Sequence, residues 1–529
     1  MKKHSLALSL FLLLGSIVSA QTTNNKPAAP DETDCANLAG AGNPLWSIKS
    51  AEFVQPPLSI AARRGTQGKI SVETPFCRVT GRVTLNARSE IDFELWLPRR
   101  HDWNGKFAGV GSGASRGTIE YQALMRALAR GYAAVATDSG HQSTLGYDVS
   151  WALGQPDRVI DFGYRAQHTV TQAAKVLTAK FYGSAPRHSY FVGCSQGGHH
   201  AFMEAERFPA DYDGIVAGAP VYSWTNEMTG QVWNLRALQQ TPAGALPVAK
   251  LQLLYDSVVT TCAGADGLID DPRHCSSDPS VLQCTATNEG SCLTNGEVEA
   301  VRTMYQGPRT PAGKQIYPGL SRGGEIGWDR LWSNPGQLGG SGLGFYRFVV
   351  FQNPSWDLAT MDFARDSALA KQKFGKILDP DNPDLSGFAK SGGKIIVYHG
   401  WADDMVPSQV SIDYYDSVTS RMGATRVNGF YRLFMVPGML HCGGGPGADV
   451  LFRSEEATAV PLAPDRDMLT ALEQWVEHDR APSSFVASRL DKDGTIQRTR
   501  LLCPYPATAK YRGDGDVMRA ENYACSLDR

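Results

Sequence analysis

The chain has 529 residues, which is enough for a large hydrophobic core and more than a typical single domain contains. It carries 51 lysine and arginine residues against 53 aspartate and glutamate residues, so the formal net charge is −2. A charge balance this close to zero gives no electrostatic reason to expect nucleic acid or an anionic membrane as the partner.

The N-terminus, MKKHSLALSLFLLLGSIVSAQ, has the pattern of a secretory signal peptide. Two lysines precede an apolar run from Leu6 to Val18, which is too short to span a membrane, and Ala20 ends a small-residue cleavage site. We therefore expect residues 1–20 to be removed and the mature protein to be secreted or periplasmic. The mature chain would have 49 basic and 53 acidic residues. An uncleaved anchor helix is the alternative.

The first half of the mature chain shows strands alternating with helices. Apolar and polar residues alternate from about Ser71, which predicts strands over residues 70–85 and 91–98. The elements expected next are strands at Gly131–Asp138, Ser189–Gly193 and Tyr212–Pro220 and helices at Arg165–Phe181 and Gly198–Phe208. This order indicates an α/β fold with a mostly parallel sheet.

The regular alternation stops after Pro220 and resumes at Gly392. Later elements are expected at 394–399 and Tyr431–Pro437, both strands, and at Asp465–His478, a helix. We predict one α/β domain, made of residues 21–220 and 392–529 and interrupted by an insertion of residues 221–391. Two independent sequential domains are the alternative, which is disfavoured because the strands return too late to complete a second sheet.

The residues Gly193-Cys194-Ser195-Gln196-Gly197 fit the G-x-S-x-G pattern of a nucleophile elbow. They lie between a predicted strand and a predicted helix, where a side chain is pushed out at the end of a sheet. Free N–H groups at the start of the helix favour a developing oxyanion. Ser195 is therefore the candidate nucleophile, and an ordinary strand-to-helix turn is the alternative.

A serine nucleophile needs a base that accepts its proton, and in hydrolases with this elbow the chain order is serine, acid, histidine. His441 follows FMVPGML, where a strand leads into a glycine-rich loop, so we predict that it is the base. His478 is expected at the surface of a helix and His399 in a structural role. His199 and His200 are expected to pack within the helix after the elbow.

The segment HGWADDMVP has the H-G-x-x-D-x-x-V-P shape of an acid loop, which selects Asp403 as the residue that holds the imidazole. Asp404 is expected to face solvent. An oxyanion hole needs two N–H donors, for which the sequence offers Gln196 and the loop Gly111-Ser112-Gly113. A plain glycine turn is the alternative for that loop.

All ten cysteines lie in the mature chain, and an even number in an exported protein suggests disulfides. A zinc site is set aside because no C-x-x-C pair occurs. Cys194 precedes Ser195 and Cys442 follows His441. If the serine and the histidine meet, the two cysteines come close enough for a disulfide that joins their loops.

This Cys-Ser … Asp … His-Cys arrangement resembles the tannase/feruloyl esterase family of secreted α/β-hydrolases, which includes the MHETase of plastic-degrading bacteria. The matching stretches are DWNGKF, GVGSG, ATDSGH, SYFVGCSQGG, FPADYDGIVAGAP, YHGWADDMVP, FMVPGMLHCGGGPG and CPYPATAKYRGDGD. The resemblance implies Ser195 as nucleophile, Asp403 as acid and His441 as base, with oxyanion amides at Gly113 and Gln196. It implies the disulfides Cys35–Cys77, Cys194–Cys442, Cys262–Cys275, Cys284–Cys292 and Cys503–Cys525.

The resemblance also implies that the insertion is a lid, in which many family members hold calcium. The matching loop is CAGADGLIDDPRHC, against C-D-x-x-D-G-x-x-D-G in the family. Ala263 replaces the first aspartate and the loop is short. Asp266, the Leu268 carbonyl and Asp270 remain as candidate ligands for calcium, which binds oxygens. A disulfide-closed turn with its acids facing water is the alternative.

The function that the resemblance implies is a serine esterase that cleaves small aromatic esters, such as feruloyl or galloyl esters, without a catalytic cofactor. Hydrolysis of terephthalate half-esters and noncatalytic binding of polyphenols or cell walls are the alternatives. The complete catalytic set argues against a binding protein. Lid aromatics that are candidates for the substrate-pocket wall, or for the core of the lid, are Trp328, Trp332, Phe345 and Trp356.

Overall fold

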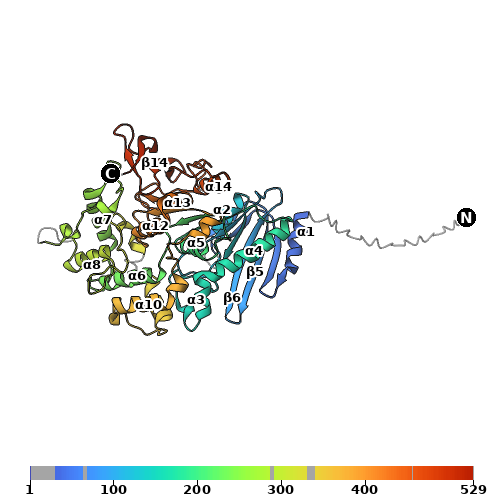
Figure 1. The fold of residues 1–529 in the computed structure, drawn as a ribbon, viewed down its shortest axis with the longest axis horizontal. Coiled ribbons are helices and arrows are strands. Elements are labelled where there is room, and N and C mark those ends of the chain that lie inside the picture. The colour runs from blue at the N-terminus through green and yellow to red at the C-terminus, as the bar shows by residue number, and fades with distance from the viewer. Residues whose placement is uncertain (2–29, 64–67, 286–290, 331–339, 455–456, 528–529) are drawn as a thin grey trace.

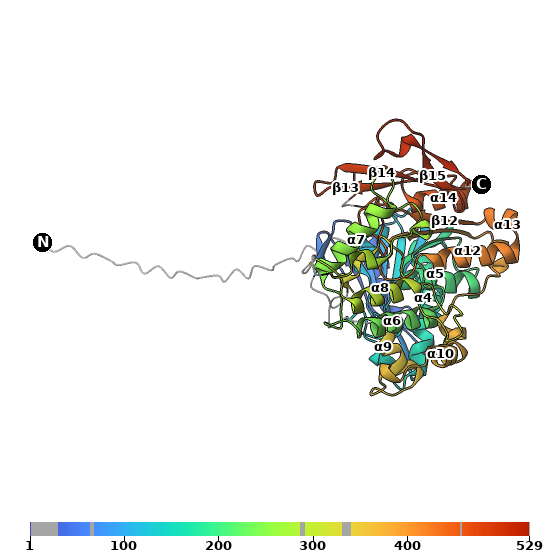
Figure 2. The same cartoon turned by 90° about the vertical axis from the view of Figure 1, so that its left-hand side faces the viewer.

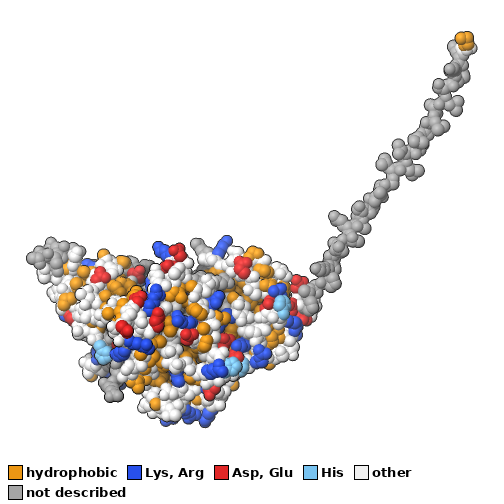
Figure 3. All heavy atoms as spheres, turned by 90° about the horizontal axis from the view of Figure 1, so that it is seen from above, with side chains coloured by type: hydrophobic (Ala, Val, Ile, Leu, Met, Phe, Trp, Pro, Cys, Tyr) orange, Lys and Arg blue, Asp and Glu red, His pale blue; other side chains and the backbone are white. Residues whose placement is uncertain are grey.

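The structure is a computed structural model that describes Met1 and residues 30–527, apart from 64–67, 286–290, 331–339 and 455–456 (Figure 1). Apart from Met1, the predicted signal peptide therefore lies outside the described residues. Among the residues described, no helix combines the length and apolar character needed to cross a bilayer. Acidic and basic side chains are interspersed over the face shown in Figure 3.

Ten strands of the described residues form one mixed central sheet. In spatial order they are β1 (Gly42–Asn43), β2 (Trp46–Val54), β5 (Phe76–Asn86), β6 (Ser89–Pro98), β8 (Ala133–Thr137), β7 (Lys106–Val110), β9 (His188–Cys194), β10 (Gly214–Gly218), β11 (Lys394–Gly400) and β12 (Tyr431–Val436). The pairs from β1 to β8 are antiparallel, and the pairs from β8 to β12 are parallel. The parallel half carries the predicted elbow and acid loop.

Helices cover both faces of the sheet, which explains why β8, β10 and β11 are buried along almost their whole length. One face packs against α2 (Tyr121–Ala129) and α14 (Met468–His478), and the other against α4 (Ala166–Tyr182), α5 (Gln196–Arg207) and α12 (Gln409–Met422). Alternate residues of β11 enter the two cores, since Ile395 and Val397 join one cluster and Ile396 the other.

The described residues between Gly218 and Lys394 contribute no strand to the central sheet. Their helices are α6 (Trp224–Leu238), α7 (Val248–Cys262), α8 (Asn295–Gln306), α9 (Gly342–Gly344), α10 (Phe363–Leu378) and α11 (Ser386–Lys390). The remaining short helices are α1 (Pro30–Asn37), α3 (Pro156–Ile160) and α13 (Ala424–Asn428). The role of the insertion as a lid stays a prediction.

In the described part of the chain, six strands lie outside the central sheet. They form the antiparallel pairs β3 (Leu58–Ala61) with β4 (Lys69–Val72), β13 (Phe485–Leu490) with β14 (Ile496–Leu502), and β15 (Thr508–Tyr511) with β16 (Tyr523–Ser526). The last two pairs lie over one end of the molecule beside α7 (Figure 2). The predicted strand over residues 70–85 is wrong in one respect, because it is split into β4 and β5 around Pro75.

Candidate active site

The elbow forms a tight turn between β9 and α5, with Ser195 at its tip. Ser195 has φ 61° and ψ −119°, a left-handed conformation that residues with a side chain rarely adopt. A Cβ on Gly193 would lie 2.6 Å from the carbonyl carbon of Gly197, so no side chain fits there. Gly193 is therefore needed for the turn that presents the serine hydroxyl.

The loop Gly111-Ser112-Gly113 lies directly against the first turn of α5. A Cβ on Gly111 would come within 2.4 Å of the Gly197 Cα, so the two backbones are in close contact. Gln196 is the first residue of α5, where backbone N–H groups have no partner within the helix. The structure therefore brings together the loop and the helix end that hold the two predicted oxyanion amides.

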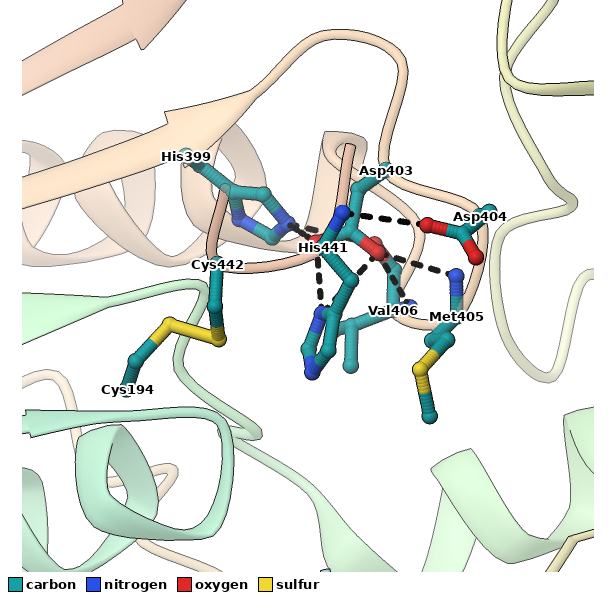
Figure 4. The surroundings of a disulfide bond; sticks show 8 residues. All are labelled: Cys194, His399, Asp403, Asp404, Met405, Val406, His441 and Cys442. Carbon is teal, nitrogen blue, oxygen red and sulfur yellow. Dashed lines mark hydrogen bonds and ion pairs between the residues drawn. A yellow bond between two sulfur atoms is a disulfide. The ribbon is translucent and has the colours of Figure 1, made fainter. Parts of the chain in front are cut away.

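His441 and Asp403 meet at the ends of adjacent strands, β12 and β11. The Nδ1 atom of His441 lies 2.8 Å from Oδ2 of Asp403 (Figure 4). Oδ1 of Asp403 also accepts hydrogen bonds from the backbone N–H groups of Met405, at 2.9 Å, and Val406, at 2.8 Å. The carboxylate is fully buried, so these bonds fix its orientation.

Burial and charge act in opposite directions on this pair. Burial alone would raise the pKa of Asp403, but the charge of His441 and hydrogen bonds from His399 and His441 lower it below its usual range. Burial alone would lower the pKa of His441, but the charge and hydrogen bond of Asp403 raise it. The pair is therefore arranged to stabilise an imidazolium next to a carboxylate.

His399 is a further partner of Asp403. Its Nε2 atom lies 3.1 Å from both Asp403 Oδ2 and the carbonyl oxygen of Val406, and its Nδ1 atom lies 2.8 Å from the Ser411 hydroxyl. Because a carbonyl only accepts, Nε2 carries the proton and donates it, while Ser411 donates to Nδ1. The structural role expected for His399 is thus to hold the acid, and no local sequence signal distinguishes that role.

The prediction that Asp404 faces solvent is wrong. Its side chain is buried, and Oδ1 accepts a hydrogen bond of 3.0 Å from the backbone N–H of His441. Burial and the neighbouring charge of Asp403 raise the pKa of Asp404 to about 6. Arg330 lies 3.6 Å from its other oxygen. Both aspartates therefore contact the same histidine, one through its side chain and one through its backbone.

A disulfide joins the serine loop to the histidine loop. Cys194 and Cys442 are 248 residues apart in sequence, and their Cα atoms are 6.0 Å apart (Figure 4). Each is the direct neighbour of Ser195 or His441. All five pairs implied by the resemblance are present as disulfides: Cys35–Cys77, Cys194–Cys442, Cys262–Cys275, Cys284–Cys292 and Cys503–Cys525.

The competing histidines lie as expected. His199 and His200 are buried in α5, and their Nε2 atoms contact the carbonyl oxygens of Leu378, at 2.8 Å, and Phe162, at 2.9 Å. His478 is the last residue of α14. These contacts place the imidazoles of α5 in backbone hydrogen bonds, which leaves His441 as the candidate base.

Three of the four aromatic residues named in the insertion belong to the hydrophobic core of the molecule. Trp328 is fully buried, and Phe345 and Trp356 are buried in a second cluster. Their contacts favour the alternative that these rings stabilise the insertion. Trp332 lies outside the described residues.

The candidate calcium ligands do not fit a calcium ion in this structure. Oδ2 of Asp266 lies 2.5 Å from Nη1 of Arg500, and Asp270 forms an ion pair with the other terminal nitrogen of the same guanidinium. The Leu268 carbonyl accepts a hydrogen bond of 2.9 Å from Gly264. Asp266 is buried, so the alternative in which both acids face water does not describe it either.

A second group of potential metal ligands comprises His168, Glu204 and Asp211. His168 Nδ1 lies 2.6 Å from Asp211, and the Lys175 ammonium donates to the Asp211 carbonyl. Burial and the neighbouring Asp211 raise the pKa of Glu204 well above its usual range. Asp211 therefore already contacts an imidazole nitrogen through its carboxylate and an ammonium group through its backbone carbonyl.

Comparison with known proteins identifies the family. The sequence profile of the family described as "Tannase and feruloyl esterase" matches residues 77–526. The chain belongs to the tannase and feruloyl esterase family. An uncharacterized esterase of Xanthomonas campestris is 34% identical, with 98% of this chain and 94% of the relative aligned. A probable feruloyl esterase B-1 of Aspergillus fumigatus is 31% identical, with 97% and 99% aligned.

Solved structures of the tannase and feruloyl esterase family share the fold. Feruloyl esterase B from Aspergillus oryzae is 29% identical with a TM-score of 0.86, covering 94% of this chain and 100% of that one. Tannin acyl hydrolase from Aspergillus niger has a TM-score of 0.75 at 21% identity, covering 94% and 95%, which shows the fold alone. The predicted α/β-hydrolase fold, the family and a carboxylic ester hydrolase activity are thereby confirmed.

Proposed function

We propose that this esterase hydrolyses small aromatic esters through an acyl-enzyme on Ser195, with His441 as general base and Asp403 as the acid. One observation carries the proposal. The imidazole is held through Nδ1 by a buried carboxylate, on a loop that a disulfide joins to the residue before Ser195. With Nδ1–H donated to Asp403, Nε2 has the lone pair that accepts the serine proton.

In the first half of the reaction, His441 takes the proton of Ser195 as Oγ bonds to the ester carbonyl carbon. The carbonyl oxygen becomes an oxyanion, which the amides of Gln196 and Gly113 stabilise. The carbon–oxygen bond to the alcohol then breaks, and the alcohol leaves with the proton from His441. A water molecule repeats the sequence on the acyl-enzyme, releases the acid and regenerates the serine.

The substrate class proposed is an ester of a phenolic acid, either a hydroxycinnamate or a gallate. The family description, tannase and feruloyl esterase, and a relative named feruloyl esterase support an aromatic acyl group. We also propose that the protein acts after export, either in the periplasm or outside the cell. Five disulfides and the signal-peptide pattern support that location, because such bonds persist in oxidising compartments.

A substrate panel and covalent labelling together test this function. Hydrolysis of methyl ferulate and methyl gallate is expected to exceed hydrolysis of a terephthalate half-ester and of a matched aliphatic methyl ester. A fluorophosphonate reagent is expected to modify Ser195, as read by peptide mass spectrometry, and to abolish hydrolysis in parallel. Modification at another serine with full loss of activity contradicts the mechanism, whereas a preference for the half-ester contradicts only the substrate class.

The pH dependence of kcat/KM follows from the raised pKa of His441. The base must be neutral to accept a proton, so activity rises with pH and is half-maximal above the ordinary histidine value of about 6.5. Glu227 is buried, and burial raises its pKa to about 7. The negative charge of Glu227 in turn helps to raise the pKa of His441.

Replacing Glu227 with glutamine removes a negative charge that favours the imidazolium. The half-maximal pH of kcat/KM is therefore expected to move to a lower value in Glu227→Gln. Glu299→Gln, at an exposed position on α8, is the matched control and should leave the profile in place. If the pH profile of kcat/KM were the same in Glu227→Gln and in the wild type, the charge of Glu227 would not act on His441.

A further inference from the structure

A buried guanidinium lies where the sequence predicts a calcium ion. The side chain of Arg500, on β14, is 3% exposed, and its Nη1 atom lies 2.5 Å from Oδ2 of Asp266. Its Nη2 atom forms a hydrogen bond and ion pair with Oδ1 of Asp270. One guanidinium thus bridges the two carboxylates, which come from the loop between Cys262 and Cys275.

Two further groups of the C-terminal strands support this contact. Arg498 lies two residues before Arg500, on the same side of β14, and its Nη2 atom donates a hydrogen bond of 2.7 Å to the backbone carbonyl of Asp266. The guanidinium carbon of Arg500 lies 4.3 Å from the ring centroid of Tyr523, in cation–π geometry. Strands β14 and β16 therefore hold a positive charge against the loop between Cys262 and Cys275, which we call the lid loop.

The oxygens that calcium would use already face proton donors. Oδ1 of Asp266 accepts from the Leu268 N–H at 3.2 Å, and the Leu268 carbonyl accepts from the Gly264 N–H at 2.9 Å. Two guanidinium groups already balance the two carboxylate charges. A divalent cation would add positive charge beside two guanidinium groups and next to the buried carboxylate of Asp266, which is costly.

The lid loop also contacts the loop that leads to His441. A Cβ on Gly438 would lie 2.7 Å from Cδ2 of Leu268, so the leucine packs directly on that backbone. Gly438 is three residues before His441 in the sequence. The position of the lid loop therefore bears on the loop that carries the candidate base.

We propose that Arg500 takes the place of a metal ion in this lid. The guanidinium clamps Asp266 and Asp270 to the C-terminal strands, so that the stability of the protein does not depend on divalent cations. Removing the guanidinium leaves two carboxylates that calcium then bridges. This proposal concerns stability and stands independently of the catalytic mechanism.

The wild-type protein provides the first measurement. After purification without added metal, mass spectrometry is expected to find no stoichiometric calcium. The thermal midpoint, recorded at one scan rate, is expected to be the same in chelator and in calcium chloride. The proposal would be overturned, without any variant, if the protein contained one calcium ion per molecule. It would also be overturned if prolonged chelation lowered the thermal midpoint of the protein.

Variants at Arg500 provide the second measurement. In chelator, Arg500→Ser is expected to lower the midpoint by about 5 °C or more, because it leaves a buried carboxylate without its partner. Arg500→Lys keeps a positive charge at this position, so its thermal midpoint should fall by less. Arg519→Ser removes an exposed arginine paired with Asp516 and is the matched control, with a midpoint near that of the wild type.

Calcium is then added to each variant, with magnesium and sodium chloride at equal ionic strength for comparison. Calcium is expected to restore part of the lost midpoint in Arg500→Ser but not in the double variant Arg500→Ser/Asp266→Asn. The proposal is overturned if calcium raises the midpoint of Arg500→Ser no more than magnesium or sodium does. It is equally overturned if Arg500→Ser is as stable as the wild type in chelator.

Discussion

Replacing Ser195 with alanine is expected to lower kcat for the preferred aromatic ester by about 10⁴- to 10⁶-fold, because the acyl-enzyme no longer forms. The thermal midpoint should change little. Alanine keeps the Cβ atom, so the left-handed turn at φ 61° gains no strain beyond that already present. KM, which reports ground-state contacts away from the hydroxyl, should stay within a small factor.

The measurement is steady-state hydrolysis with a separate binding assay, so that loss of turnover is distinguished from loss of substrate binding. Ser417→Ala is the matched control, since this exposed serine of α12 donates a hydrogen bond to the Asp413 carbonyl on its own helix. Residual activity of Ser195→Ala within tenfold of the control would show that another residue is the nucleophile.

The double variant Cys194→Ala/Cys442→Ala is expected to lose about 4–5 kcal/mol of unfolding free energy. The reason is the long segment that the bond closes, since the two cysteines are 248 residues apart. The kcat for ester hydrolysis should fall as well, by about tenfold or more, because the hydroxyl of Ser195 and the imidazole of His441 lose a covalent restraint on their relative position.

The matched control is Cys503→Ala/Cys525→Ala, which opens a segment of 22 residues outside the catalytic loops. Loop entropy predicts a smaller loss there, about 3 kcal/mol, with kcat unchanged. Denaturant unfolding gives the free energies and initial rates give kcat. If both double variants lowered kcat equally, the bond between Cys194 and Cys442 would have no particular role in placing the catalytic pair.

Local patterns predicted the central sheet best where a strand is buried on both faces. The strands β8, β10 and β11 are short apolar runs that end at glycine or threonine, and each was expected close to its actual bounds. The strand β2 was missed because it lies near the antiparallel edge and is half exposed, without a continuous apolar run. The pairs β13–β14 and β15–β16 lack the helix between strands that made the α/β pattern readable.

The candidate site divides in the same way. The elbow is a local motif, so the turn at Ser195 was predictable from the G-x-S-x-G spacing together with its place between a predicted strand and a predicted helix. Asp404 was misjudged because its burial depends on the return of the His441 loop, which no local pattern encodes. The contact of His399 with Asp403 depends on how the loop between them bends, and the contact of Arg500 with Asp266 joins segments far apart in the sequence. Local patterns therefore predict neither contact. Cys194–Cys442 followed from the expected meeting of Ser195 and His441, whereas the other four cysteine pairs came from the family resemblance, since ten cysteines allow many connectivities.

The bond between Cys194 and Cys442 has a consequence for a protein exposed to proteases. The whole insertion lies between these two cysteines, so a protease that cuts one peptide bond there leaves a single covalent molecule. Exposed loops are the usual sites of such cuts. The fragment that bears Ser195 and the fragment that bears His441 stay linked through the direct neighbours of these two residues. Nicking of the insertion therefore separates the halves only after the disulfide is reduced.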